Sequence, residues 1–163
     1  MKKILFVASE GVPFIKTGGL ADVVGALPKC IDREYYDVRV ILPKYVCMTQ
    51  AMKDRLTYRT HFYMDFHWQN QYVGILESEV DGIKFYFIDN EFYFNGFKPY
   101  CDNALFEIEK FAFFSKAALS ILPVIDFRPD LIHCHDWQTG LVPVYLHERF
   151  QGSDFYRGIK TVM

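Results

Sequence analysis

Apolar residues in the first forty positions form a pattern that predicts strand, helix and strand. The segment KKILFVASE is short, apolar and rich in strand formers, which is typical of a strand buried on both faces of a parallel sheet. A helix is expected next, because apolar residues recur at helical spacing at Leu20, Val23, Val24, Leu27 and Ile31. Pro28 should kink or end this helix. A second strand, YDVRVILP, completes a right-handed crossover unit.

The middle of the chain predicts three extended segments. These are LTYRTHFYMDF, QYVGILESEV and GIKFYFID, with a hairpin turn expected at Asp81-Gly82 between the last two.

The last sixty residues return to alternating helices and strands. A helix is expected from Asn103 to Leu122, with apolar residues on one face at Phe106, Phe111, Phe114, Ala118 and Leu122. After Pro129, DLIHCHD predicts a buried strand, WQTGLVPVYLHERF a helix, and GIKTVM the start of one more strand. No repeat, low-complexity tract or linker interrupts the chain. Residues 1–163 therefore predict one alternating α/β domain with a parallel sheet and an extra β-hairpin region.

Composition restricts the class of protein. The 163 residues are 51% hydrophobic, yet no apolar run approaches the roughly 20 residues of a membrane span, so no membrane partner is expected. The apolar run at Ile4–Ala8 is too short for a signal peptide, and Glu10 and Pro13 follow it, so we expect a cytoplasmic protein. The four cysteines lie far apart without a Cys-x-x-Cys pair and predict ordinary reduced thiols.

The formal net charge of −2, from 18 basic and 20 acidic residues, supplies no general field for nucleic acid. An anionic ligand must therefore be held by a local site.

One such site is predicted in FIKTGGLADVVGALP. Gly18 and Gly19 would let backbone N–H groups approach a ligand at a helix N-terminus, and Lys16 adds a positive charge, so the loop suits a phosphate. The spacing matches neither a dinucleotide fingerprint nor a P-loop. The alternative is a surface turn whose glycines satisfy backbone angles and whose lysine is solvated. Asp22, in the first helical turn, is also favoured there by the helix dipole alone.

The segment HCHDW is the second constellation. His133 and His135 would point to one face of a strand, so a metal-dependent hydrolase is one alternative, although three or four converging ligands would be needed. Asp136 and Trp137 follow a strand at the same edge as Lys16, where a carboxylate beside an aromatic ring predicts a sugar subsite. For Asp136 the alternative is capping of the following helix.

The residues carry a family resemblance. ILFVASEGVPFIKTGGLADVVGALPK, EKFAFFSKAAL and PDLIHCHDWQTGLVPVYL together closely resemble the amino-terminal domain of bacterial glycogen synthases and plant starch synthases. The resemblance implies a Rossmann-like N-terminal domain of a GT-B type glycosyltransferase. Its expected reaction is transfer of glucose from ADP-glucose to the non-reducing end of an α-1,4-glucan with retention, without a metal or other cofactor.

Residue roles follow from the resemblance alone. It implies that Lys16 and the amides of Gly18 and Gly19 contact the phosphates of the nucleotide sugar, and that Asp22 lies near it. The same resemblance places Asp136 near the glucosyl unit. The remaining implied substrate contacts are Trp137 and, in a looser alignment, Tyr100. Lys16 and Asp136 would be the catalytic residues. The family often has histidine where this chain has Gln138.

The final strand, GIKTVM, is where such synthases continue into a Thr-x-His-Asn segment and a second nucleotide-binding domain. We therefore expect the sequence to be a piece of a two-domain transferase, inactive by itself and completed by a missing C-terminal domain. A non-catalytic carbohydrate-binding module is a further alternative, because 18% of the residues are aromatic and YFNGFKPY has the character of an exposed segment.

Overall fold

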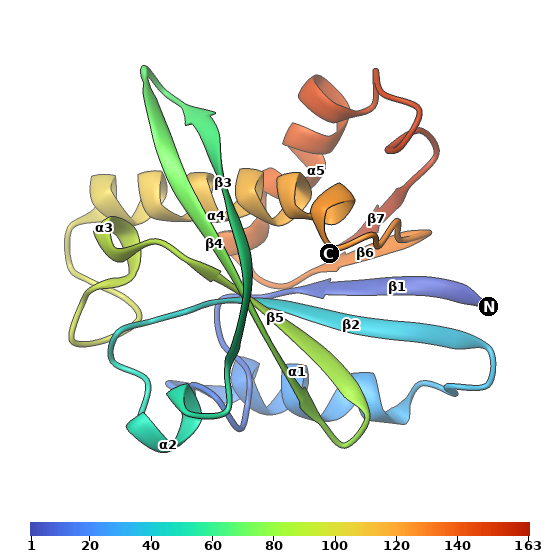
Figure 1. Ribbon diagram of the computed structural model, residues 1–163, viewed down its shortest axis with the longest axis horizontal. Coiled ribbons are helices and arrows are strands. Elements are labelled where there is room, and N and C mark those ends of the chain that lie inside the picture. Colours follow the sequence, from blue (N-terminus) through green and yellow to red (C-terminus); the bar gives the residue numbers. More distant parts are fainter.

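A seven-stranded sheet crosses the molecule and separates its helices into two layers (Figure 1). The computed structural model describes all 163 residues. The strands are β1 (Lys2–Val7), β2 (Tyr36–Pro43), β3 (Thr57–Phe66), β4 (Gln69–Val80), β5 (Ile83–Asp89), β6 (Leu131–Cys134) and β7 (Lys160–Val162). Their order across the sheet is β3-β4-β5-β2-β1-β6-β7.

The sheet is parallel except at one edge. Strands β5, β2, β1, β6 and β7 run in the same direction, while β4 is antiparallel to both β5 and β3. The predicted β1–helix–β2 crossover is confirmed, and β1 lies between β2 and β6. The predicted turn at Asp81-Gly82 is confirmed too, with φ angles of 52° and 75° that suit a tight hairpin. The fold is the mixed α/β sheet expected for the N-terminal domain of a GT-B transferase.

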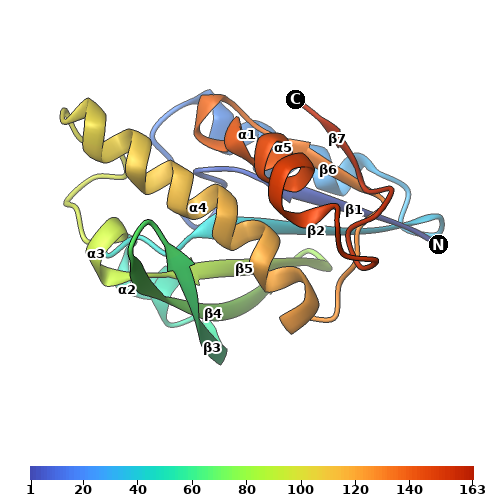
Figure 2. The ribbon, with the colours of Figure 1, turned by 90° about the horizontal axis from the view of Figure 1, so that it is seen from above.

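Helices cover both faces of this sheet. Figures 1 and 2 show α1 on one face and α4 with α5 on the other. The helices are α1 (Gly19–Cys30), α2 (Gln50–Lys53), α3 (Glu91–Phe94), α4 (Ala104–Val124) and α5 (Leu141–Tyr145), with a 3-10 turn at Trp137–Thr139 and a π-helical turn at Leu146–Phe150. A single cluster of 39 buried residues includes side chains from α1, α4 and the sheet. None of the helices combines the length and the continuous apolar sequence that a bilayer crossing requires.

The buried face of α1 differs from the prediction. Val23 and Leu27 are 48% and 37% exposed, whereas the buried residues are Ala21, Val24, Gly25 and Pro28. The reason is close packing, because a Cβ on Gly25 would lie 2.1 Å from a methyl carbon of Val12. Small residues let the helix approach the preceding loop, and this rotates the larger side chains outward. Pro28 lies in the last turn, and the helix ends two residues after it.

The helix expected from WQTGLVPVYLHERF is confirmed as a helical segment, but it is not one regular α-helix. The segment divides into the 3-10 turn, α5 and the π-helical turn. Pro143 has no N–H to donate to the carbonyl of Thr139, so an α-helical ladder cannot run through this point. Pro143 instead occupies the first turn of α5, where an N–H would have no partner in the helix.

Candidate functional site

Strand register brings the two predicted constellations to one edge of the sheet. In the parallel pair β1–β6, Val7 lies opposite Cys134, and the His135 amide donates to the Val7 carbonyl at 3.1 Å. The loop that begins at Ser9 and the segment that begins at Asp136 therefore leave neighbouring strands at their carboxyl ends. This is where ligands bind in open α/β sheets.

The Lys-Thr-Gly-Gly turn is shaped by a buried carboxylate that the sequence reading did not single out. Glu10 is only 3% exposed and accepts hydrogen bonds from the Thr17 amide at 2.5 Å and the Thr17 hydroxyl at 2.8 Å. The next two amides, of Gly18 and Gly19, donate to no group in the structure. Because Glu10 fixes the turn, these two N–H groups are available at the start of α1.

Lys16 and Asp22 form an ion pair across the same turn. The Lys16 Nζ lies 2.7 Å from both carboxylate oxygens of Asp22, and both side chains are about half exposed. An exposed pair of this kind contributes little to stability, about 0–1 kcal/mol. An incoming phosphate can therefore replace the Asp22 carboxylate as the partner of Lys16 at a small cost in free energy.

Asp136 has a strained backbone and an uncommitted carboxylate. Its φ of 60° with ψ of 177° lies in a region that residues other than glycine rarely occupy, and it typically costs about 1–3 kcal/mol. The conformation is held by Thr139, whose amide and hydroxyl both donate to the Asp136 carbonyl. The Asp136 side chain makes no capping hydrogen bond, so the capping alternative does not describe this position.

Tyr100 links the middle of the chain to the glycine turn. Its hydroxyl lies 2.7 Å from the Ser9 hydroxyl, while Tyr45 donates to the Ser9 carbonyl at 2.9 Å. Burial raises the pKa of Tyr100 to about 12, and the nearby charges of Glu10 and Asp136 act in the same direction. Tyr100 therefore keeps its proton at neutral pH and lies close to both constellations.

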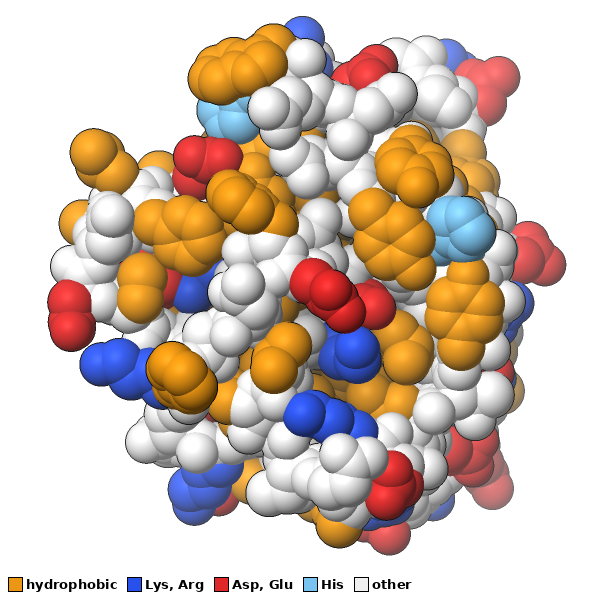
Figure 3. All heavy atoms as spheres, turned by 60° about the vertical axis from the view of Figure 1, so that its left-hand side comes forward, with side chains coloured by type: hydrophobic (Ala, Val, Ile, Leu, Met, Phe, Trp, Pro, Cys, Tyr) orange, Lys and Arg blue, Asp and Glu red, His pale blue; other side chains and the backbone are white.

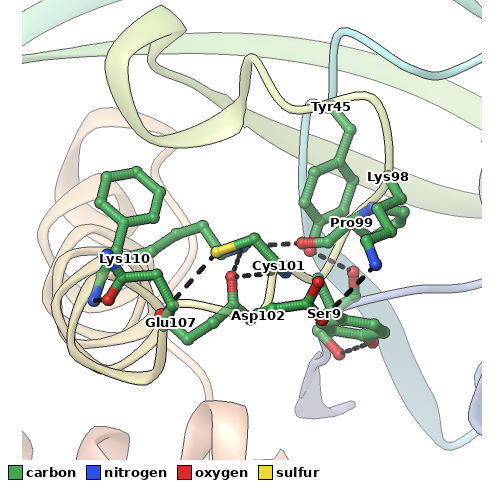
Figure 4. A network of polar contacts seen from close by, with 11 residues as sticks. Ser9, Tyr45, Lys98, Pro99, Cys101, Asp102, Glu107 and Lys110 are labelled. Atoms are coloured by element: carbon green, nitrogen blue, oxygen red, sulfur yellow. Dashed lines mark hydrogen bonds and ion pairs between the residues drawn. The ribbon is translucent and has the colours of Figure 1, made fainter.

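A buried ion pair holds the segment that carries Tyr100 (Figure 4). Glu107 and Lys110, one turn apart on α4, are 5% and 3% exposed and bond to each other. Lys110 also donates to the Pro99 carbonyl at 2.7 Å, and Glu107 accepts from the Cys101 amide at 3.1 Å. The residues immediately before and after Tyr100 are thus both fixed to α4.

A cavity of about 450 Å³ opens beside Tyr100. Tyr100, Trp137 and Gln138 line it, together with Glu107 and neighbouring residues at the start of α4. Trp137 is 57% exposed and rests edge-on against Phe111, with ring centroids 5.4 Å apart. The buried Gln138 Oε1 has no hydrogen-bond partner within the chain. The cavity therefore offers the exposed face of the Trp137 ring, while the unpaired Gln138 Oε1 lies buried beneath its lining.

The two histidines of HCHDW lie on one face, as predicted. Their ring centroids are 4.1 Å apart, and the His135 ring stacks on Phe6 at 5.4 Å. Burial lowers the pKa of His135 to about 4, so its ring is neutral at pH 7. No group of three or more His, Cys, Asp or Glu side chains is placed to hold a metal ion. The hydrolase alternative therefore gains no support from the geometry.

Two groups of side chains in this site were absent from the sequence prediction. The first is Glu10, which lies three residues after the end of β1 and could have been noted as a carboxylate at the carboxyl edge of the sheet. The second is the Glu107–Lys110 pair, whose spacing of three residues on a predicted helix is a detectable signal. Ser9 and Tyr45 have no local signal, because their contacts join distant parts of the chain.

The chain matches the family model of the starch synthase catalytic domain over residues 3–163. It belongs to the starch synthase catalytic domain family. The match covers nearly the whole sequence and confirms the resemblance seen in the separated motifs.

The curated relatives that match this chain carry the name glycogen synthase. The chain is 66% identical over 163 residues to a glycogen synthase of Lachnoclostridium phytofermentans and 62% identical over 164 residues to that of Lachnospira eligens. These two alignments cover 100% of this chain and 34% of each relative's length. The chain therefore spans about a third of the curated proteins it matches.

A solved structure shows the same fold. The catalytic domain of Starch Synthase IV from Arabidopsis thaliana, bound to ADP and acarbose, superimposes with a TM-score of 0.83 at 32% identity. The likeness covers 97% of this chain and 32% of that one.

Proposed function

We propose that this chain forms the N-terminal part of a glycogen synthase that transfers glucose from ADP-glucose to the non-reducing end of an α-1,4-glucan, with retention at the anomeric carbon. The observation that carries the proposal is the β1–β6 register, because the loop that contains the Lys-Thr-Gly-Gly turn and the segment that contains Asp136 leave neighbouring strands at the same edge of the sheet. The relatives support the reaction by their names, and the plant neighbour, which was solved with ADP, supports the choice of nucleotide.

The glycine turn is suited to the leaving group. As the glucosyl–phosphate bond breaks, negative charge grows on the departing diphosphate. Lys16 and the free amides of Gly18 and Gly19 would stabilise that charge, with Asp22 releasing the lysine as the phosphate arrives. Because Glu10 already fixes the turn, the two amides need no rearrangement at the moment of reaction.

Asp136 would stabilise the positive charge that develops on the sugar. The sugar becomes oxocarbenium-like as the bond breaks, and a carboxylate with no hydrogen-bond partner can stabilise it electrostatically. The acceptor glucan would enter the cavity beside Tyr100, where the exposed Trp137 ring offers a stacking face. No step in this scheme uses a metal.

We expect the 163 residues by themselves to bind the nucleotide sugar without turning it over. On the loop from Ser9 to Gly19, Lys16 is the single cation, and one lysine with two amides offsets only part of a diphosphate's charge. We propose that a C-terminal domain of the same enzyme supplies the remaining cationic groups.

The test is transfer of radiolabelled glucose from ADP-glucose to glycogen, by the full-length synthase that we propose contains this chain. UDP-glucose is the parallel donor. The Lys16→Ala variant should lose about a hundredfold in kcat, since one charged donor at such a site contributes about 3 kcal/mol. Lys29→Ala is the matched control, because Lys29 lies at the other end of α1 and should be neutral.

Equal losses for Lys16→Ala and Lys29→Ala would contradict the phosphate role. Transfer from UDP-glucose in preference to ADP-glucose would contradict the donor assignment and leave the reaction class intact.

A further inference from the structure

A chain of hydroxyl groups connects the cavity beside Tyr100 to the Lys-Thr-Gly-Gly turn. The parallel strands direct their carboxyl ends toward the left-hand side of Figure 1, and Figure 3 brings that side forward, with hydrophobic side chains exposed among charged ones. The Tyr100 ring lines the cavity at this edge, whereas Ser9 and Glu10 behind it are buried. Thr17 is exposed in the turn. These four residues therefore extend from the interior to a surface that a ligand can reach.

The carboxylate of Glu10 is the end of this chain. The Thr17 hydroxyl donates to it at 2.8 Å, and the Thr17 amide donates to the same oxygen. None of the ion pairs in the structure includes Glu10, so the buried carboxylate depends on these two donors of Thr17. A hydroxyl has one proton to donate. Because the Thr17 proton goes to Glu10, the Thr17 oxygen can only accept from other groups.

Tyr100 is the middle of the chain. Its oxygen lies 2.7 Å from the Ser9 hydroxyl. Burial raises the pKa of Tyr100 to about 12, and side-chain hydrogen bonds with Ser9 and Thr17 oppose this effect. Since Thr17 can only accept, Tyr100 donates to Thr17 and accepts from Ser9. Each bond in such a chain strengthens the next, so loss of one hydroxyl weakens the others.

The backbone of the Tyr100 segment is fixed by different contacts. Lys110 donates to the Pro99 carbonyl, and Glu107 accepts from the Cys101 amide. Figure 4 shows Lys110 and Glu107 at one end of this network and Ser9 at the other. The α4 contacts thus place the backbone of residue 100, while the hydroxyl chain orients its ring in the cavity.

We propose that Thr17 is a positioning residue for the acceptor sugar, acting through Tyr100. Its hydroxyl orients the Tyr100 ring, while its backbone amide and Glu10 hold the turn that presents the Gly18 and Gly19 amides. One residue therefore sets the acceptor side and the phosphate side relative to each other. That the cavity receives a glucan and the turn a diphosphate rests on the proposed function.

The two roles of Thr17 are separated by a pair of substitutions in the full-length synthase that we propose contains this chain. Thr17→Val keeps the shape and the backbone amide of residue 17 but removes the hydroxyl. Thr17→Ser keeps the hydroxyl. Calorimetric titrations measure the affinities for maltoheptaose and for ADP, and KM for glycogen and for ADP-glucose is measured alongside.

The proposal predicts that Thr17→Val binds maltoheptaose about tenfold more weakly, the upper range for one lost hydrogen bond, and binds ADP within about threefold of the parent. KM for glycogen should rise in parallel, with KM for ADP-glucose little changed. Thr17→Ser should stay within about threefold of the parent for both ligands. A purely structural role for Thr17 would lower the melting temperature without separating the two ligands.

Ser9 provides an independent test, because it is fully buried and acts only through Tyr100. Ser9→Ala should also weaken maltoheptaose binding, by about fivefold. The double variant with Thr17→Val should lose much less than the product of the two single losses, because both changes break one chain. Ser120→Ala is the matched control, since its hydroxyl bonds to the Lys116 carbonyl within α4. It should leave both affinities unchanged.

Equal weakening of maltoheptaose and ADP binding in Thr17→Val would overturn the proposal, as would weak maltoheptaose binding by Thr17→Ser. Losses that multiply in the double variant would show that Ser9 and Thr17 act separately, and would overturn it as well. These results leave the proposed function standing, since its test uses Lys16 and transfer from ADP-glucose. Absence of transfer by a parent that shows the predicted binding pattern would instead remove only the proposed function.

Discussion

Breaking the buried ion pair on α4 gives a prediction with a large and distinctive effect. In the Lys110→Met variant, the Glu107 carboxylate stays buried with only the Cys101 amide as donor, and the Pro99 carbonyl loses its partner. Removing one member of a buried pair typically costs about 3–5 kcal/mol. We expect a loss of about 4 kcal/mol in the free energy of unfolding, a large fraction of the 5–15 kcal/mol of an ordinary domain.

The double variant Glu107→Gln/Lys110→Met provides the internal control. A glutamine oxygen can still accept from the Cys101 amide, and no buried charge remains. Only the Pro99 carbonyl is left without a donor, at about 1–3 kcal/mol. The double variant should therefore be more stable than Lys110→Met alone. Urea unfolding followed by circular dichroism measures all three proteins.

Two results would refute this reasoning. If Lys110→Met costs less than about 1 kcal/mol, Lys110 is solvated and does not hold the Tyr100 segment. If the double variant is less stable than the single one, the charge of Glu107 is not the source of the penalty.

Further predictions concern three other positions. Tyr100→Phe removes the hydroxyl contact with Ser9 and should lower the free energy of unfolding by about 1 kcal/mol in a urea titration, and no change would show that this contact is absent in solution. Asp136→Gly relieves the positive φ and should raise the free energy of unfolding by about 1 kcal/mol while abolishing glucosyl transfer, whereas a destabilised variant would argue against backbone strain. His135, with its pKa lowered by burial to about 4, remains neutral in the folded chain at pH values where the unfolded chain is protonated. Its neutral ring therefore costs no stability above pH 6.5, and the free energy of unfolding falls by about 3 kcal/mol as the pH drops from 6.5 to 4. In His135→Phe, the free energy of unfolding should depend less on pH over that range.

Much of the fold follows from local pattern. The crossover at the N-terminus, the hairpin at Asp81-Gly82 and the buried strand before Asp136 were all predicted, because continuous apolar runs and turn residues are local signals. The shared edge of Lys16 and Asp136 was predicted from topology, since parallel strands direct their carboxyl ends the same way.

The features that the sequence did not predict depend on packing between segments that are distant in the chain. The outward rotation of Val23 and Leu27 follows from the contact of Gly25 with Val12, which no helical periodicity contains. The contact between Ser9 and Tyr100 joins residues 91 positions apart, so no spacing rule predicts it. The free carboxylate of Asp136 likewise depends on Thr139 holding an unusual backbone angle.

The central claim is that a diphosphate binds at the turn formed by Lys16, Gly18 and Gly19. Titration of ADP into the ¹⁵N-labelled chain, followed by amide chemical shifts, tests it most directly. We predict the largest shifts at the Gly18 and Gly19 amides and their loss in Lys16→Ala. Largest shifts elsewhere on the chain, or an unchanged response in Lys16→Ala, would contradict the account.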